Sequence, residues 1–171
     1  MAYTIVPVVR ADEHISVTTA TMFVSSTPEK DDREIRLHAF LSRYNSPLAQ
    51  EARVFIREAD KHDLDWKLVP AIAGVESTFG RFIPPGSYNA WGWGIPTDAQ
   101  SGITFSSFSE GIHVVSEGLK TNYIGKGAQT LEQIGAIYAD SNAWSNHVRF
   151  FIDAIDAYTP NSPQFLAFTI D

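Results

Sequence analysis

Glu76 is the residue whose setting most clearly indicates chemistry. It is the sole ionisable side chain in residues 68–79, which read LVPAIAGVESTF. A helix of this composition is apolar on nearly every face and should be buried. Burial disfavours the charged form of a carboxyl group and raises its pKa, which is what a general acid working near neutral pH requires. We therefore expect Glu76 to hold and donate a proton.

A neutral, aromatic segment with several glycines follows Glu76. Between Ser77 and Ser109 the only formal charges are Arg81 and Asp98. The aromatic residues there are Phe79, Phe82, Tyr88, Trp91, Trp93, Phe105 and Phe108. Aromatic faces pack against the C–H faces of sugar rings, and amide or backbone groups hydrogen-bond sugar substituents. The same aromatics could instead fill a core beneath a long loop, and composition leaves both interpretations open.

Three helices should precede this segment. The first is expected to start at Thr27 and the second at Ser46, because each is an N-cap residue followed by proline. The third is expected to be capped by Asp65 and to stop at Gly80. Residues 81–107 then form a loop or short hairpin, since Gly and Pro recur there.

Three further helical segments follow the insert. Apolar spacing predicts one over 112–123, a short one from Thr130 to Tyr138 opened by a capping box, and a long one over 148–155. The segments 3–24 and 164–170 could be short strands. The fold class expected is therefore mainly α, a single helical domain with a loop insert after the third helix.

Composition bounds the domain count and the class of partner. The 171 residues, 44% of them hydrophobic, suit one domain over 27–160, with an extended segment at 1–26 and a tail at 161–171. A net charge of −7 argues against nucleic acid or an anionic membrane as a partner. Neither a signal h-region nor a membrane span is recognisable in the first 24 residues. We expect a monomer.

Metal and nucleotide chemistry have little support in the sequence. The five histidines are scattered, no HExxH motif occurs, and no second histidine lies within a helical turn of another, so no zinc site is expected. The acidic cluster at 60–65 lacks the spacing of a calcium loop. Neither a GxSxG elbow nor a GxxxxGK[ST] loop is present.

Four motifs carry a resemblance to a known family. They are GVESTFG at 74–80, YNAWGWGI at 88–95, FSSFSEGI at 105–112, and Tyr138 with Ala139, followed by Asp140 and Trp144. In order and spacing they resemble the glucosaminidase family of bacterial cell-wall hydrolases, within the lysozyme-like superfamily, over about residues 65–156. The resemblance implies a lysozyme-like helical domain that cleaves the glycan strands of peptidoglycan.

The resemblance also implies roles for individual residues. Glu76 matches the family's catalytic acid, and Tyr138 would orient the sugar or stabilise positive charge at the anomeric centre. Residues implied or expected to bind substrate are Ser77, Phe79, Tyr88, Asn89, Trp91, Gly92 and Trp93. The alternatives are a salt bridge from Glu76 to Arg53, Arg81 or Arg149, and a purely structural Tyr138.

The second catalytic group is less well defined. Asp98 is our candidate because it is the only acid between Glu76 and Glu110, although it could equally be a turn residue after Pro96. Poorer candidates are Glu110, Glu117 and Asp140. A single acid would suffice if the substrate's N-acetyl oxygen assists, or if its C6 hydroxyl attacks intramolecularly.

The expected function is an endo-β-N-acetylglucosaminidase acting on peptidoglycan strands. The rivals are a lytic transglycosylase with the same acid and a non-catalytic module that binds peptidoglycan or chitin. No cofactor is expected, because acid-catalysed acetal cleavage needs none. The expected location is extracellular or in the cell envelope or periplasm, as a mature form whose signal peptide has been removed.

Overall fold

The computed structural model describes residues 31–94, 103–139 and 142–160. The elements are α1 (Asp32–Arg43), η1 (Pro47–Glu51), α2 (Ala52–His62), α3 (Leu68–Ser77), α4 (Phe108–Gly118), η2 (Leu119–Tyr123), η3 (Ile124–Lys126), α5 (Leu131–Tyr138) and α6 (Asn142–Asp156). The described residues contain no strand, which confirms the mainly α class. The predicted terminal strands and Asp98 lie outside the described residues.

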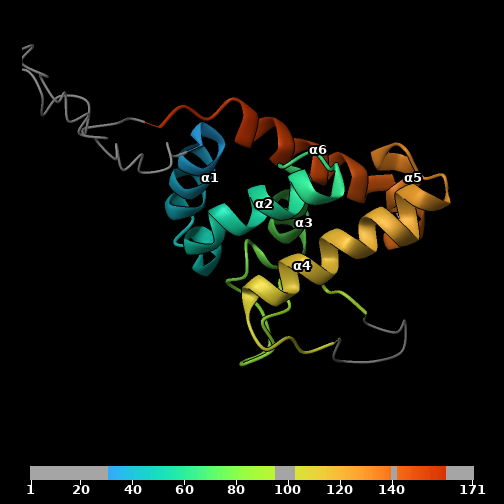
Figure 1. Cartoon of the computed structure of the whole chain (residues 1–171), viewed down its shortest axis with the longest axis horizontal. Helices are drawn as coiled ribbons and strands as arrows, with labels where there is room; N and C mark the ends of the chain where they lie inside the picture. Colours follow the sequence, from blue (N-terminus) through green and yellow to red (C-terminus); the bar gives the residue numbers. More distant parts are fainter. Residues whose placement is uncertain (1–30, 95–102, 140–141, 161–171) are drawn as a thin grey trace, which may run out of the picture.

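Helix α3 occupies the middle of the fold. In Figure 1 it lies between α6 above and α4 below, and it packs chiefly against α6. Every residue from Leu68 to Gly74 is buried, as the uncharged sequence predicted. Gly74 has to be small, because a Cβ there would lie 2.7 Å from the ring of Phe79 and 2.9 Å from that of Phe151. The helix that carries Glu76 is therefore held by close packing.

Two of the predicted caps are confirmed. The Ser46 hydroxyl accepts from the backbone N–H of Leu48 at 3.0 Å, and a 3₁₀ turn leads from there into α2. The Thr130 and Gln133 side chains form the reciprocal capping box that opens α5. These caps depend on contacts within a few residues, which is why the sequence predicts them.

Two predicted helix boundaries need correction. Thr27 lies outside the described residues, and α1 starts instead at Asp32, because the Asp31 carboxylate accepts from the N–H of Arg33 at 2.8 Å. Helix α3 ends at Ser77 rather than Gly80, because Thr78 already has a left-handed backbone, with φ of 50°. Asp65 caps the turn before α3, where its carboxylate accepts from the N–H of Lys67 at 3.0 Å.

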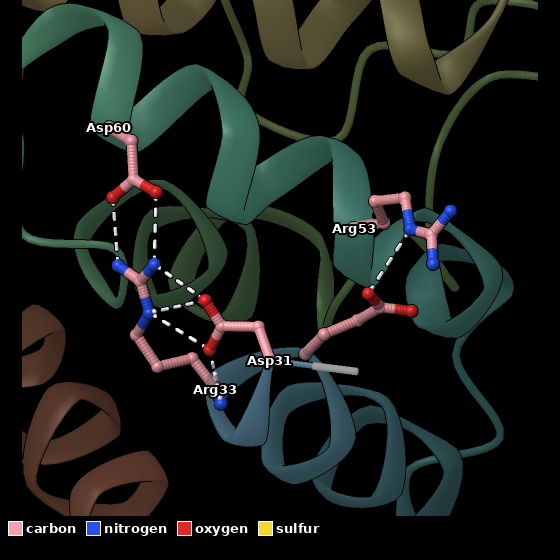
Figure 2. Close-up of polar contacts among 5 residues, drawn as sticks. Asp31, Arg33, Arg53 and Asp60 are labelled. Atoms are coloured by element: carbon pink, nitrogen blue, oxygen red, sulfur yellow. Dashed lines mark hydrogen bonds and ion pairs between the residues drawn. The ribbon is translucent and has the colours of Figure 1, made fainter. Parts of the chain in front are cut away.

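A guanidinium joins α1 to α2 at the surface. Figure 2 shows Arg33 between two carboxylates, with Nη1 at 2.8 Å from Asp60 and Nη2 at 2.7 Å from Asp31. Arg53 of α2 also donates to Glu34 of α1, at 3.1 Å. Exposed ion pairs usually contribute only about 0–1 kcal/mol each, so these pairs orient α1 more than they stabilise the fold.

The helix predicted over 112–123 is not uniform. Helix α4 passes into the five-residue π turn η2 and then into the 3₁₀ turn η3, which ends at Gly127 with φ of 103°. The π turn places the centroid of the Tyr123 ring 5.9 Å from that of Trp93 and 6.0 Å from that of Tyr138. Such turns often mark functional positions. None of the described helices has both the length and the apolar character needed to cross a membrane.

Candidate active site

Glu76 lies at the penultimate position of α3, where the helix reaches solvent. Its Oε1 accepts a hydrogen bond of 2.7 Å from Nε1 of Trp144, on α6. Trp144 itself is buried, at 5% exposure. Because α3 and α6 pack against each other, this contact fixes the carboxyl group at the junction of the two helices.

Two opposing effects act on the pKa of Glu76. Burial raises the pKa, and the hydrogen bond from Trp144 lowers it, with a net shift upward. The side chain is nevertheless open to solvent, which corrects the sequence-based expectation of full burial. A partly desolvated carboxyl group that a ligand can still reach suits proton donation.

The salt bridges considered for Glu76 do not form among the described residues. Arg53 pairs with Glu34, and Arg149 pairs with Glu132. Arg81 places its guanidinium over a neighbouring phenylalanine ring, 5.5 Å from the centroid. The carboxyl group thus has a neutral donor and no described cation to hold it in the charged form.

The chain after Glu76 has an unusual backbone. Thr78, Phe79 and Gly80 are all left-handed, with φ of 50°, 59° and 79°. This conformation costs on the order of 1–2 kcal/mol for each residue with a Cβ, and β-branched threonine rarely adopts it. Strain of this kind persists only where surrounding contacts impose it, and it is common next to functional residues.

Two buried serines impose that conformation. The Ser77 hydroxyl donates to the carbonyl of Ala90 at 2.7 Å and accepts from the N–H of Gly80 at 2.8 Å. The Ser46 hydroxyl donates to the carbonyl of Phe79 at 2.7 Å. Ser77 was predicted to bind substrate, but it is 4% exposed and connects the end of α3 to the following loop instead.

Asn89 organises the loop that follows. Its Oδ1 accepts from the N–H groups of Trp91 at 3.3 Å and Trp93 at 3.0 Å. Its Nδ2 donates to the carbonyls of Trp93 at 2.9 Å and Ile103 at 2.8 Å. All four bonds stay within the protein and the residue is 7% exposed, so Asn89 shapes the loop rather than contacting a ligand.

Phe79 and Trp91 also belong to the interior. Both are fully buried, and Nε1 of Trp91 donates to the carbonyl of Val69 at 3.0 Å. In this structure both side chains therefore fill the core beneath the loop, and their contact with substrate stays a prediction. Tyr88 is 39% exposed and packs edge-on against Phe108, at 5.2 Å between ring centroids.

Gly92 and Trp93, by contrast, line a cleft. It has a volume of about 430 Å³ and is lined by Gly92, Trp93, Gly94, Asn122, Tyr123, Ile137 and Tyr138. A second hollow of about 230 Å³ shares Trp93 and Asn122 with it and also contacts Glu117. The two hollows thus share a wall, and we refer to them together as the groove.

Tyr138 connects this groove to Glu76. Its ring stacks on Trp144, with centroids 4.9 Å apart and planes at 24°, and Trp144 holds Glu76. The Tyr138 hydroxyl donates to the carbonyl of Trp91 at 2.6 Å. Burial first, and the nearby Glu76 and Tyr123 next, raise the pKa of Tyr138, so the phenol stays neutral. Tyr138 thus positions the acid and forms part of the cleft wall.

The structure leaves the second carboxylate open. Asp98 and Asp140 lie outside the described residues. Glu110 accepts hydrogen bonds from the backbone and side chain of Ser106, both at 2.5 Å, and these lower its pKa. Of the two candidate acids that the structure describes, Glu117 lines the groove.

Sequence reasoning gave no site role to four of these residues. Trp144 holds the acid, while Asn122, Tyr123 and Ile137 line the cleft. The available signal for Trp144 was its place soon after Tyr138 in the fourth motif, ahead of the helix predicted over 148–155. Nothing local to η2 indicated a π turn.

Comparison with known proteins identifies neither a family model nor a curated protein that matches this chain. The chemistry assigned to the site therefore depends on Glu76, its partner Trp144 and the groove beside them.

Proposed function

We propose that this protein cleaves β-1,4 bonds in a polymer of N-acetylated amino sugars, as in peptidoglycan glycan strands, with Glu76 as general acid. The observation that carries the proposal is a carboxyl group with a raised pKa, held by Trp144 next to an aromatic groove. Four motifs with the order and spacing of the glucosaminidase family support it. Such strands lie in the cell envelope, which is where we place the activity.

The groove supports a carbohydrate substrate. Trp93, Tyr123 and Tyr138 present aromatic surface to it, and the backbone at Gly92 and Gly94 can approach a ligand closely. Asn122 adds an amide that can bind hydroxyl or N-acetyl groups. Because the lining of the larger hollow carries no formal charge, sugar binding there need not depend on the protein's net charge of −7.

The surroundings of Glu76 suit both stages of proton transfer. Burial favours the protonated carboxyl group before the reaction, so a proton is available for the glycosidic oxygen. After transfer, the Trp144 N–H stabilises the carboxylate that remains. The anomeric centre, left with positive character, is then captured by water, by the substrate's N-acetyl oxygen or by its C6 hydroxyl.

Mass spectrometry of borohydride-reduced products from purified peptidoglycan tests the proposal. Reduced glucosamine ends are the expected result and identify a glucosaminidase. Anhydromuramyl ends would instead identify a lytic transglycosylase, in which the C6 hydroxyl is the nucleophile. Binding to sacculi without release of soluble fragments at any pH would contradict catalysis and identify a binding module.

Replacing Trp144 with phenylalanine should shift the pH dependence of the activity. The variant loses the hydrogen bond that lowers the pKa of Glu76 but keeps an aromatic ring, so burial acts unopposed and the pKa rises. Glu76 is active when protonated, so activity is lost as pH rises through its pKa. The alkaline limb of kcat/KM against pH should therefore move to higher pH in W144F.

A matched control is Trp66→Phe, because Trp66 lies in the turn before α3 and contacts Lys67, at 5.2 Å from the ring. The alkaline limb of kcat/KM against pH should be the same in Trp66→Phe as in the wild type. If that limb does not move in a folded W144F protein, a group other than Glu76 determines it.

A further inference from the structure

Helices α2 and α4 bring together three side chains with metal-binding atoms. Figure 1 shows the two helices side by side, and they are in direct contact. Oε2 of Glu58 lies 2.9 Å from Nδ1 of His113 and 3.6 Å from Nε2 of His62. One ligating atom from each residue lies within 4.8 Å of the others. The chain thus gathers two imidazoles and one carboxylate at one place.

One atom of this cluster is otherwise unexplained. Nε2 of His62 is buried and has no hydrogen-bond partner among the described residues. Its separation of 3.6 Å from Glu58 is too long for a hydrogen bond. Buried polar atoms are nearly always satisfied, and an exception indicates a strained group, a water molecule or an ion.

We propose that Glu58, His62 and His113 bind one divalent cation of the zinc class. Imidazole nitrogen suits zinc, copper and nickel, and zinc also accepts carboxylate oxygen. Three protein ligands with a water molecule in the fourth position form a familiar tetrahedral zinc arrangement. With zinc–nitrogen bonds of about 2.0–2.1 Å, tetrahedral ligands lie about 3.3 Å apart, so small side-chain movements would complete the site.

Two nearby cations oppose the metal but do not block it. Nη2 of Arg57 lies 3.0 Å from Oε1 of Glu58, on the carboxylate oxygen that does not face the histidines. Nζ of Lys61 lies 3.6 Å from Oε2, on the same side as the metal. Lys61 is half-exposed, so its side chain can turn into solvent. Its charge should weaken zinc binding, and its removal should strengthen it.

A bound metal would cross-link α2 and α4. Glu58 and His62 are one turn apart on α2, whereas His113 comes from α4. Because a ligand that binds only the folded state stabilises it, zinc should raise the unfolding temperature of the protein. This role is independent of the proposed cleavage of sugars, since none of the three residues lines the groove.

Calorimetric titration of the tag-free full chain with zinc chloride tests the site. We expect one zinc per chain and a higher unfolding temperature with zinc. His62→Gln and His113→Gln should each weaken binding at least about tenfold, because even loss of a group behind a metal ligand costs that much. Lys61→Gln should bind zinc several-fold more tightly, an effect that a merely structural cluster would not produce.

His147→Gln is the matched control, because His147 is an exposed histidine on α6 outside the cluster. It should bind zinc as the wild type does. If a histidine variant fails to fold, the wild-type protein loaded with cobalt(II) still tests the proposal. Tetrahedral coordination of cobalt(II) gives an intense visible absorption, which is the expected result. Absence of zinc binding by the wild type, or equal binding by the double variant of His62 and His113, would overturn the proposal.

Discussion

The Glu76→Gln variant should lose nearly all cleavage of glycan strands while it remains folded. Glutamine has almost the same shape, and its carbonyl oxygen can still accept the hydrogen bond that Trp144 donates at 2.7 Å. Its amide cannot serve as the proton donor. General acid catalysis typically contributes about 10²–10⁴-fold, and we expect kcat/KM on soluble glycan fragments to fall by that factor.

Glu132→Gln is the matched control. Glu132 is an exposed residue of α5 that pairs with Arg149, and the substitution removes one carboxylate in the same way. Its activity should equal that of the wild type within about twofold, since exposed pairs contribute little. Full activity in a folded Glu76→Gln protein would exclude Glu76 as the acid.

Stability measurements separate loss of the acid from loss of the fold. The pKa of Glu76 is higher in the folded protein than in the unfolded chain, so the folded state binds the proton more tightly. The stability that Glu76 confers is therefore greatest below its usual pKa and declines as pH rises through the raised value. A glutamine side chain does not titrate, so its contribution to stability does not change with pH in this way. The variant should accordingly be at least as stable as the wild type at pH 7, and its advantage should vanish in acid.

Local features of this fold could be predicted from the sequence. The Ser46 and Thr130 caps need only side chains that lie within three residues, so a single segment contains all the information. The burial of α3 follows equally from its own composition. The start of α1 was misplaced because Thr27 followed by proline has the local pattern of an N-cap, whereas the cap that forms is Asp31.

The site was predicted less completely, because its residues meet across the fold. Glu76 stood out as a lone carboxyl group in an apolar helix, but Trp144, its partner, lies 68 positions later. Asn89 has a side chain that could bind sugar or fold a loop, and the choice depends on Trp93 and Ile103. Likewise, His113 has metal-binding potential only because α4 packs on α2.

Replacing Trp91 with alanine should be among the most destabilising single changes in this protein. The side chain is fully buried, packs on Phe55 at 6.3 Å between centroids, and donates to the carbonyl of Val69. Truncating a buried aromatic of this size to alanine typically costs about 3–5 kcal/mol. The total free energy of unfolding of a small domain is only about 5–15 kcal/mol, so the midpoint of urea unfolding should fall sharply.

The same substitution distinguishes a core residue from a sugar-binding one. Trp91→Phe should cost less, because it keeps most of the apolar volume and loses chiefly the hydrogen bond to Val69, worth about 0.5–1.5 kcal/mol. Trp66→Ala is the control for a tryptophan that is only partly buried, and it should be milder than Trp91→Ala. If Trp91→Ala left the urea midpoint unchanged but abolished binding to glycan strands, Trp91 would be a ligand contact after all. We expect the opposite result. Because the carbonyl of Trp91 accepts a hydrogen bond from Tyr138, loss of the Trp91 side chain should first loosen the loop, and the cleft should lose its shape as a consequence.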